Sequence, residues 1–241
     1  MQYFILFLII TSLIAIHELG HFWMARFVGI PIQRFSIGFG PKLLSVHHRK
    51  TEFRLSLIPL GGFVLPEESS QQRFLEIPIW KRLLFVAGGP LASLGLPVLL
   101  FAGMNLVQDG VSVWGLHVQP FIQSFEMGQY FLESLLMIGQ EPSQTIGVVG
   151  MFWQVGEMQT LVWTSWIMLS ALLTLNLGLI NLLPIPVLDG GKIMMYLFEW
   201  LYPASRKLQA PLTIISSIGI ILLMVGLIIK DVVMILDSTL A

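Results

Sequence analysis

The sequence predicts an α-helical protein that crosses a membrane about four times and carries a membrane-associated β-hairpin or small sheet after the first crossing. Of its 241 residues, 55% are hydrophobic and only 11% are charged, whereas soluble domains have about 25% charged residues. The apolar residues gather in stretches of about 20, which is the length needed to cross a hydrocarbon core of about 30 Å. We expect one membrane-embedded domain, residues 1–241, with spans at about 3–25, 83–106, 161–183 and 211–229.

The first predicted span holds three ionisable side chains within apolar sequence. His17 and His21 are four residues apart, so on a helix they project from the same face. Glu18 lies beside them, which completes the pattern His-Glu-x-x-His, in which two histidines bind zinc and the glutamate acts as a general base. A chance match or a polar patch on a buried helix is the alternative. Ionisable groups inside a membrane are costly unless paired or liganded, so the metal site is the better interpretation.

The charges predict how the chain is oriented in the membrane. Nine of the thirteen Lys and Arg residues lie in the region 26–82, and none lies between residues 83 and 181. By the positive-inside rule, 26–82 is cytoplasmic, 107–158 is outside, and both termini are on the outer side. The charges give no indication of nucleic-acid binding. No cleavage site follows the first apolar run, which favours a retained span over a signal peptide.

The two predicted loop regions differ in character. In 26–82, alternating residues at 32–37 and 52–57, separated by a turn at 38–41, predict short β-strands. This sheet is either an ordinary cytoplasmic hairpin or an edge that pairs with an extended substrate by strand addition. In 107–158, polar and apolar residues alternate with helical spacing, which predicts an amphipathic helix at the outer membrane surface.

A third metal ligand is expected from the end of the third span. Pro184 and Pro186 interrupt the helix there, and Asp189 follows before a short helix that we expect to begin at Lys192. Catalytic zinc commonly has three protein ligands and one open position. The chain contains no cysteine, which excludes thiolate ligands, so Asp189 is the candidate. We also expect the segment Gly88-Gly89-Pro90 of the second span to pack closely against the metal-binding helix.

Taken together, these segments resemble the site-2 protease family of intramembrane zinc metalloproteases, specifically the bacterial regulator-of-sigma-E type. The matching segments are His17-Glu18-Leu19-Gly20-His21, Phe35-Ser36-Ile37-Gly38-Phe39-Gly40, Ile58-Pro59-Leu60-Gly61-Gly62-Phe63-Val64, Gly89-Pro90 and the stretch from Asn181 to Gly190. Two departures stand out. Ser93 occupies the position where the family often has Asn after Gly-Pro-x-x, and only about fifty residues separate the second and third spans, which is too few for the PDZ modules of such relatives.

The resemblance implies the roles of the site residues and the partners. It implies that His17, His21 and Asp189 bind Zn²⁺ and that Glu18 is the catalytic base. It also implies that substrate is held by Asn176, Asn181 and the segment Gly38-Phe39-Gly40. The implied substrate is a transmembrane segment of a membrane protein, often an anti-sigma factor, within the lipid bilayer of a bacterial inner membrane, after an upstream site-1-type protease has cut the same substrate.

Two other functions are compatible with the sequence. A catalytically silent member of the family could bind transmembrane segments as a sorting or chaperone subunit, and a zinc transporter could also place histidines in a membrane helix. The glutamate beside the two histidines favours hydrolysis, because neither binding nor transport requires a general base at that position.

Overall fold

A computed structural model of the chain describes residues 1–67, 74, 76–138 and 162–240. Among these residues, four helical segments are long and apolar enough to cross a membrane. They are α1 (Gln2–Val28), α3 (Ile79–Asp109), α7 (Trp163–Asn181) and the segment Pro203–Leu236, in which the 3-10 helix η2 (Pro203–Leu208) continues into α9 (Gln209–Leu240). The predicted fold class is therefore confirmed, and the protein is an integral membrane protein.

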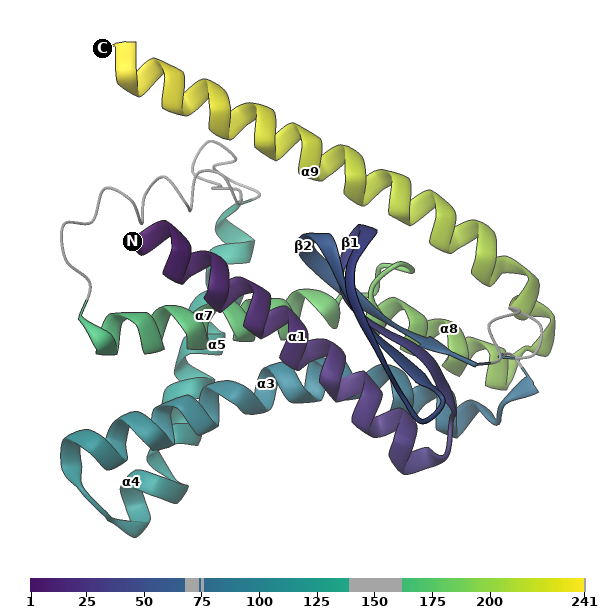
Figure 1. The fold of residues 1–241 in the computed structure, drawn as a ribbon, viewed down its shortest axis with the longest axis horizontal. Helices are drawn as coiled ribbons and strands as arrows, with labels where there is room; N and C mark the ends of the chain where they lie inside the picture. The colour runs from purple at the N-terminus through teal and green to yellow at the C-terminus, as the bar shows by residue number, and fades with distance from the viewer. Residues whose placement is uncertain (68–73, 75, 139–161, 241) are drawn as a thin grey trace.

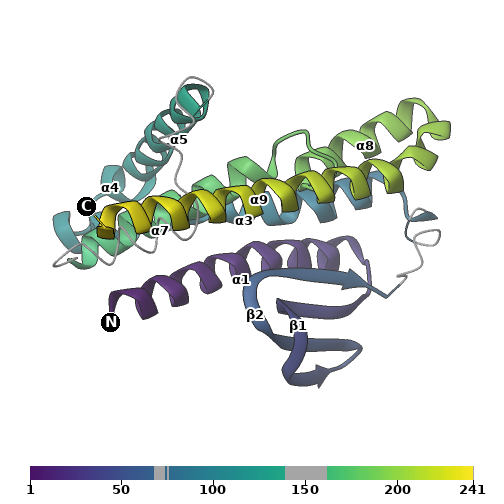
Figure 2. The same cartoon turned by 90° about the horizontal axis from the view of Figure 1, so that it is seen from above.

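The helices α1, α3 and α7 form the centre of the molecule (Figures 1 and 2). Helices α1 and α3 touch at a pair of glycines: a Cβ atom at Gly20 would meet the carbonyl oxygen of Gly88, and a Cβ at Gly88 would meet that of Gly20. Without side chains at these positions the two backbones can approach each other directly, as is common between membrane helices. This confirms the close packing that the sequence predicts for the Gly88 segment.

The region after α1 forms a sheet of two long antiparallel strands, β1 (Ile32–His48) and β2 (Thr51–Pro66), beside the second half of α1 (Figure 2). The sequence predicted a turn at 38–41, but β1 continues through it. Gly38 and Gly40 have φ angles of 86° and 83°, which glycine adopts readily. The strand therefore bends at these glycines without ending. Residues 34–37 pair both with residues 62–65 and with residues 52–55 of the curved β2.

Helix α8 (Asp189–Leu201) connects α7 to η2. It begins three residues earlier than predicted, because Leu188 serves as its N-cap residue and Asp189 already belongs to its first turn. The next two residues are glycines that lie against the preceding loop: a Cβ at Gly190 would meet the backbone of Leu182. The prolines of this loop end the regular helix, as predicted, and the glycines let α8 start directly against the loop.

The far end of α8 is fixed by a buried ion pair. The Arg82 guanidinium donates two hydrogen bonds of 2.9 and 2.7 Å to the carboxylate of Glu199, and both side chains are at most 5% exposed. The same carboxylate accepts hydrogen bonds from Gln209 Nε2 at 2.8 Å and from Arg206 Nε at 3.2 Å. One carboxylate therefore joins the first turn of α3, the last turn of α8, η2 and the start of α9.

The region after α3 and the last span complete the fold. Helices α4 (Val113–His117) and α5 (Gln119–Ile138) follow α3, and Asn105 of α3 donates hydrogen bonds to Gly115 and Gln123. The predicted helix of this region is present as α5, while residues 139–158 lie outside the described ranges. The most apolar stretch of the last span has no buried residue, and Figure 1 shows α9 standing away from the central helices.

Candidate metal centre

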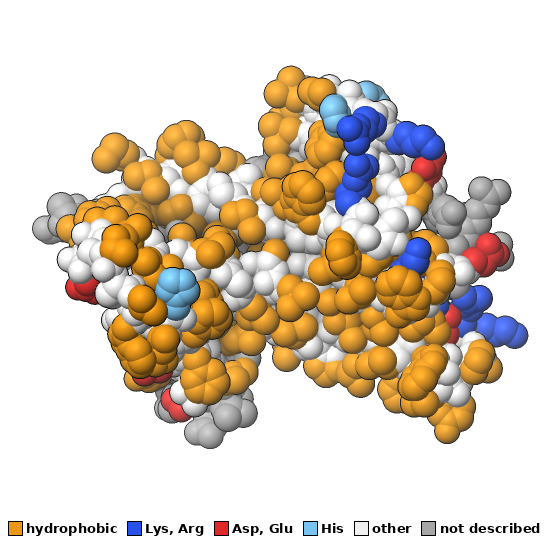
Figure 3. Space-filling model, turned by 90° about the horizontal axis from the view of Figure 1, so that it is seen from below, with side chains coloured by type: hydrophobic (Ala, Val, Ile, Leu, Met, Phe, Trp, Pro, Cys, Tyr) orange, Lys and Arg blue, Asp and Glu red, His pale blue; other side chains and the backbone are white. Residues whose placement is uncertain are grey.

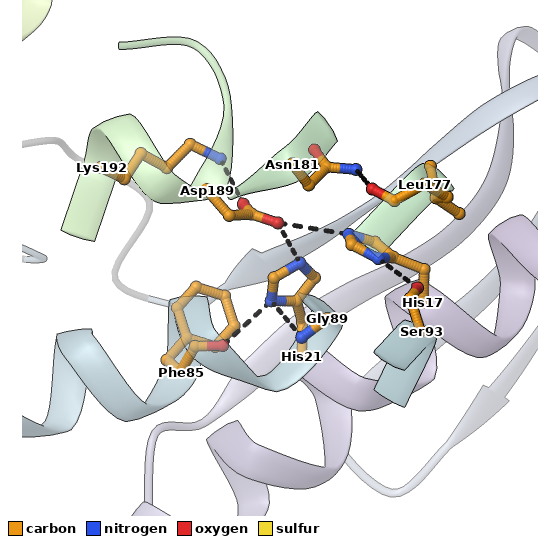
Figure 4. Close-up of polar contacts among 9 residues, drawn as sticks. All are labelled: His17, His21, Phe85, Gly89, Ser93, Leu177, Asn181, Asp189 and Lys192. Carbon is orange, nitrogen blue, oxygen red and sulfur yellow. Dashed lines mark hydrogen bonds and ion pairs between the residues drawn. The ribbon is translucent and has the colours of Figure 1, made fainter. Parts of the chain in front are cut away.

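The two histidines of α1 face α3 (Figure 4). Helix α3 contacts the Nδ1 atom of each ring, and the Nε2 atoms point toward Asp189. His21 Nδ1 donates to the Phe85 carbonyl oxygen at 2.9 Å, and His17 Nδ1 lies 2.9 Å from Ser93 Oγ. These contacts leave both Nε2 atoms directed at the same point. Fixing one ring nitrogen by a hydrogen bond is the usual way to orient a metal-binding histidine. Ser93 therefore makes a contact with the site even though the family often has Asn at this position.

Asp189 completes the cluster from the opposite side. Its Oδ2 lies 3.2 Å from His17 Nε2 and 3.1 Å from His21 Nε2, while its Oδ1 lies 3.2 Å from Lys192 Nζ. The three predicted ligand residues come from two elements far apart in the chain, and all three are buried. The break after α7 brings Asp189 back to α1, because α8 begins at that residue and its two glycines contact the preceding loop.

The geometry of this cluster fits a zinc ion. His17, His21 and Asp189 each offer one ligand atom, and these atoms lie within 4.8 Å of one another. In a tetrahedral site with Zn–N of about 2.0–2.1 Å and Zn–O of about 2.0–2.2 Å, neighbouring ligand atoms are about 3.3–3.4 Å apart, close to the nitrogen–oxygen distances observed here. Two imidazoles and one carboxylate are also the ligand types that catalytic zinc takes, with a fourth position left open.

Gly89 of α3 forms the wall of the cluster behind the two rings. A Cβ atom at this position would meet Nε2 of His21 and lie 2.6 Å from Nε2 of His17. The hydrogen atom of glycine is therefore the largest substituent that leaves the ligand atoms accessible. Phe85, Gly89 and Ser93 are spaced four residues apart, so they occupy one face of α3.

Glu18 lies next to the cluster and against the sheet. It is half-buried, and a Cβ atom at Gly62 of β2 would be 2.7 Å from its Cγ. The neighbouring Gly61 lies under the ring of Phe39, which is stacked on Phe63. Gly61 and Gly62 of β2 therefore lie between Phe39 and Glu18, one packed against each side chain.

The two asparagines expected to hold substrate lie on α7 and differ in their hydrogen bonding. Asn181 Nδ2 donates to the Leu177 carbonyl oxygen at 2.9 Å, and Figure 4 shows this nitrogen directed toward Leu177. Asn176 Oδ1 is buried and accepts no hydrogen bond among the described residues. Each amide thus keeps hydrogen-bonding capacity, but their role in substrate binding stays a prediction.

The model of peptidase family M50 matches residues 4–226 of the chain. The chain belongs to this family. Three similar proteins, each named "Putative zinc metalloprotease", come from Thermotoga maritima, Vibrio cholerae and Xylella fastidiosa. They are 41%, 41% and 44% identical over 114, 99 and 100 residues, which are 43%, 36% and 37% of this chain. The matched stretch is 22% of each relative, so this M50 chain aligns with less than a quarter of their length.

Sequence reasoning brought together the three candidate ligands of this M50 member, but it missed the residues that contact them and Glu18. The spacing of Phe85, Gly89 and Ser93 was a signal for a face of α3 that meets α1. The carbonyl of Phe85 could not be recognised in this way, because every residue has one. The contact between Glu18 and Gly62 was also missed, since it joins a helix to a strand with no shared sequence pattern.

Gly89→Ala should prevent zinc from binding while leaving the fold intact. The added methyl group would occupy the space in front of both Nε2 atoms, so we expect zinc affinity to fall by at least about 100-fold, the upper end of what supporting residues contribute. Metal content after dialysis against a zinc buffer measures this. Gly95→Ala is the matched control on the same helix, because a Cβ there meets nothing within 4 Å. Equal zinc content in the two variants would contradict the assigned position of the metal.

Proposed function

We propose that this chain is an intramembrane zinc endopeptidase that hydrolyses a peptide bond within or near a transmembrane segment of another membrane protein. The observation that carries this proposal is the buried cluster of His17, His21 and Asp189 with Glu18 beside it, packed among helices that are long and apolar enough to cross a membrane. Membership of a peptidase family and the names of the relatives support it.

Zinc held by His17, His21 and Asp189 would polarise the scissile carbonyl and lower the pKa of the attacking water. The chain supplies the proton transfers. The Glu18 carboxylate takes a proton from the attacking water and delivers it to the nitrogen of the leaving amine. The fixed Nδ1 contacts of the two histidines hold their rings during the reaction. Asn181 is a candidate donor to the developing oxyanion, because only one of its two N–H groups is used by Leu177.

The free edge of the sheet offers a place for an extended substrate. Residues 62–66 of β2 pair with β1 on one side, and no strand of the described residues pairs with their other side. Gly62 on this stretch contacts Glu18, so a peptide added to the edge would lie beside the base. Strand addition provides backbone hydrogen bonds, which would keep a transmembrane segment unwound near the scissile bond.

Family membership also suggests the substrate of the protein and the membrane in which it lies. We infer a bacterial inner membrane, an anti-sigma factor as the candidate substrate class, and prior cleavage by a site-1-type protease. Selection by PDZ modules has no counterpart in the short region 107–158, so the membrane segment and its flanks would determine substrate choice. The rival proposal of a silent, segment-binding homologue has the same ligands but no use for Glu18.

A cleavage assay with the purified chain tests this function. The zinc-loaded protein in detergent should cut a transmembrane peptide whose helix is destabilised by glycine or proline, and a chelator should stop the cleavage until zinc is restored. Binding of the peptide without any zinc-dependent cleavage would support the silent homologue instead.

Orientation in the membrane can be tested by labelling. Lys and Arg side chains gather at one end of the molecule (Figure 3). Arg82 lies in the first turn of α3 and shares the Glu199 carboxylate with Arg206, the neighbour of Lys207, whereas the opposite end of α3 carries Asp109. The positive-inside rule therefore places Lys207 in the cytoplasm. In intact cells, a membrane-impermeant thiol reagent should label Asp109→Cys but not Lys207→Cys, since the natural chain has no cysteine. The reverse result would invert the proposed topology.

A further inference from the structure

The two oxygens of the Asp189 carboxylate have different partners. Oδ2 faces His17 Nε2 and His21 Nε2, whereas Oδ1 lies 3.2 Å from Lys192 Nζ (Figure 4). Lys192 is one turn further along α8, so the contact is formed within a single helix. Its side chain is 38% exposed, which leaves most of it packed against the protein, beside a cavity that Tyr196 and Thr213 also line.

We propose that Lys192 is a positioning residue: its ammonium group holds Oδ1 of Asp189 so that only Oδ2 is presented to the metal. This inference rests on the proposed zinc peptidase function. A carboxylate can bind a metal through one oxygen or both, and rotation about its terminal bond is only weakly restricted. A second oxygen on the metal would occupy the position that catalytic zinc keeps open. The hydrogen bond from Lys192 to Oδ1 opposes that rotation.

The position of Lys192 explains how a positively charged side chain can strengthen the binding of a metal ion close to it. Its Nζ contacts Oδ1, the oxygen turned away from both histidines, and part of the side chain reaches solvent, which screens its charge. Repulsion of a metal ion is therefore weakened, while the short-range hydrogen bond keeps its directional effect. Outer contacts of this kind typically change metal affinity or activity by about 10–100-fold.

Zinc affinity measured by chelator competition, with no substrate present, tests the proposal. Lys192→Met keeps the aliphatic stem but removes the donor, and we expect it to weaken zinc binding by about 10–100-fold. Lys192→Arg retains a charged donor and should restore most of the affinity. Lys207→Met is the matched control, because this exposed lysine lies on η2 away from the cluster; it should bind zinc as the natural chain does.

The visible spectrum of the cobalt-substituted protein provides a second readout, because it reports coordination number. The natural chain, Lys192→Arg and Lys207→Met should share a four-coordinate spectrum, and Lys192→Met should shift toward five-coordinate. Unchanged affinity and spectrum in Lys192→Met would overturn the proposal. Tighter zinc binding in that variant would overturn it too, because it would show that Lys192 acts mainly as a repelling charge. Neither zinc affinity nor the cobalt spectrum depends on peptide cleavage. If the proposed peptidase function is wrong, the natural chain will bind metal but cleave no peptide, and this result is distinct from either outcome above.

Discussion

Glu18→Gln should remove nearly all peptide hydrolysis while zinc remains bound at the level of the natural chain. The substitution keeps the size of the side chain next to Gly62 and leaves His17, His21 and Asp189 in place, but an amide cannot accept the proton of the attacking water. General-base catalysis typically contributes about 10²–10⁴-fold, so the single-turnover rate of cleavage should fall by about that factor. Single-turnover cleavage of a helix-destabilised transmembrane peptide, with metal analysis on the same sample, measures both quantities.

Asp189→Ala is the informative comparison, because it removes a ligand instead of the base. This variant should lose hydrolysis and zinc together, and excess zinc should restore activity only weakly. The two inactive variants would then differ in metal content. If Glu18→Gln cleaves at the natural rate, Glu18 is not the base; if Asp189→Ala retains full zinc occupancy at low zinc concentration, Asp189 is not the third ligand.

Arg82→Met should have the largest effect on stability among single changes away from the metal centre. It leaves the buried Glu199 carboxylate without the two hydrogen bonds from the Arg82 guanidinium, and breaking a buried pair in this way costs about 3–5 kcal/mol. Burial alone would raise the pKa of Glu199, but hydrogen bonds from Arg82 and Gln209 outweigh it and hold the pKa below its ordinary value of 4.5. The pair therefore stabilises the fold at neutral pH, and this contribution should decline as the pH falls below about 4.5.

Unfolding in detergent at pH 7 and at pH 4 measures this contribution. Arg206→Met is the matched control, because Arg206 contacts the same carboxylate but is 41% exposed, and exposed pairs contribute only about 0–1 kcal/mol. Arg82→Met should also release zinc more easily, since α8 carries Asp189 at its other end. An unfolding free energy within about 0.5 kcal/mol of the natural chain, the usual range for surface substitutions, would show that the buried pair is not what fixes α8.

The structure also revises local expectations of the sequence. The turn predicted at 38–41 became a bend inside a continuous strand, because Gly38 and Gly40 adopt positive φ angles while pairing continues on both sides. The start of α8 moved from Lys192 to Asp189, because a loop rich in proline can be followed directly by a helix when glycines allow it to lie against that loop. Both differences concern where a strand or helix begins or ends, which depends on the backbone segments packed beside it.

The sequence by itself determined the four spans, the presence of a sheet after the first, and the ligand candidates. Long apolar runs have one stable solution in a bilayer, since a helix satisfies its own backbone hydrogen bonds, and the spacing of His17 and His21 is fixed by the helical repeat. The role of Asp189, which lies far along the chain from the two histidines, was inferred from the need for a third ligand.

Only the tertiary structure decided what surrounds these side chains. Contacts between Ser93 and His17, between Gly62 and Glu18, and between Lys192 and the outer oxygen of Asp189 depend on how helices and strands approach one another. Sequence periodicity gives the face of an element but not its partner or its depth, because packing is settled by side chains from distant segments that fit together. The candidate ligands His17 and His21 could therefore be recognised from local pattern, whereas the contacts that orient them required the assembled fold.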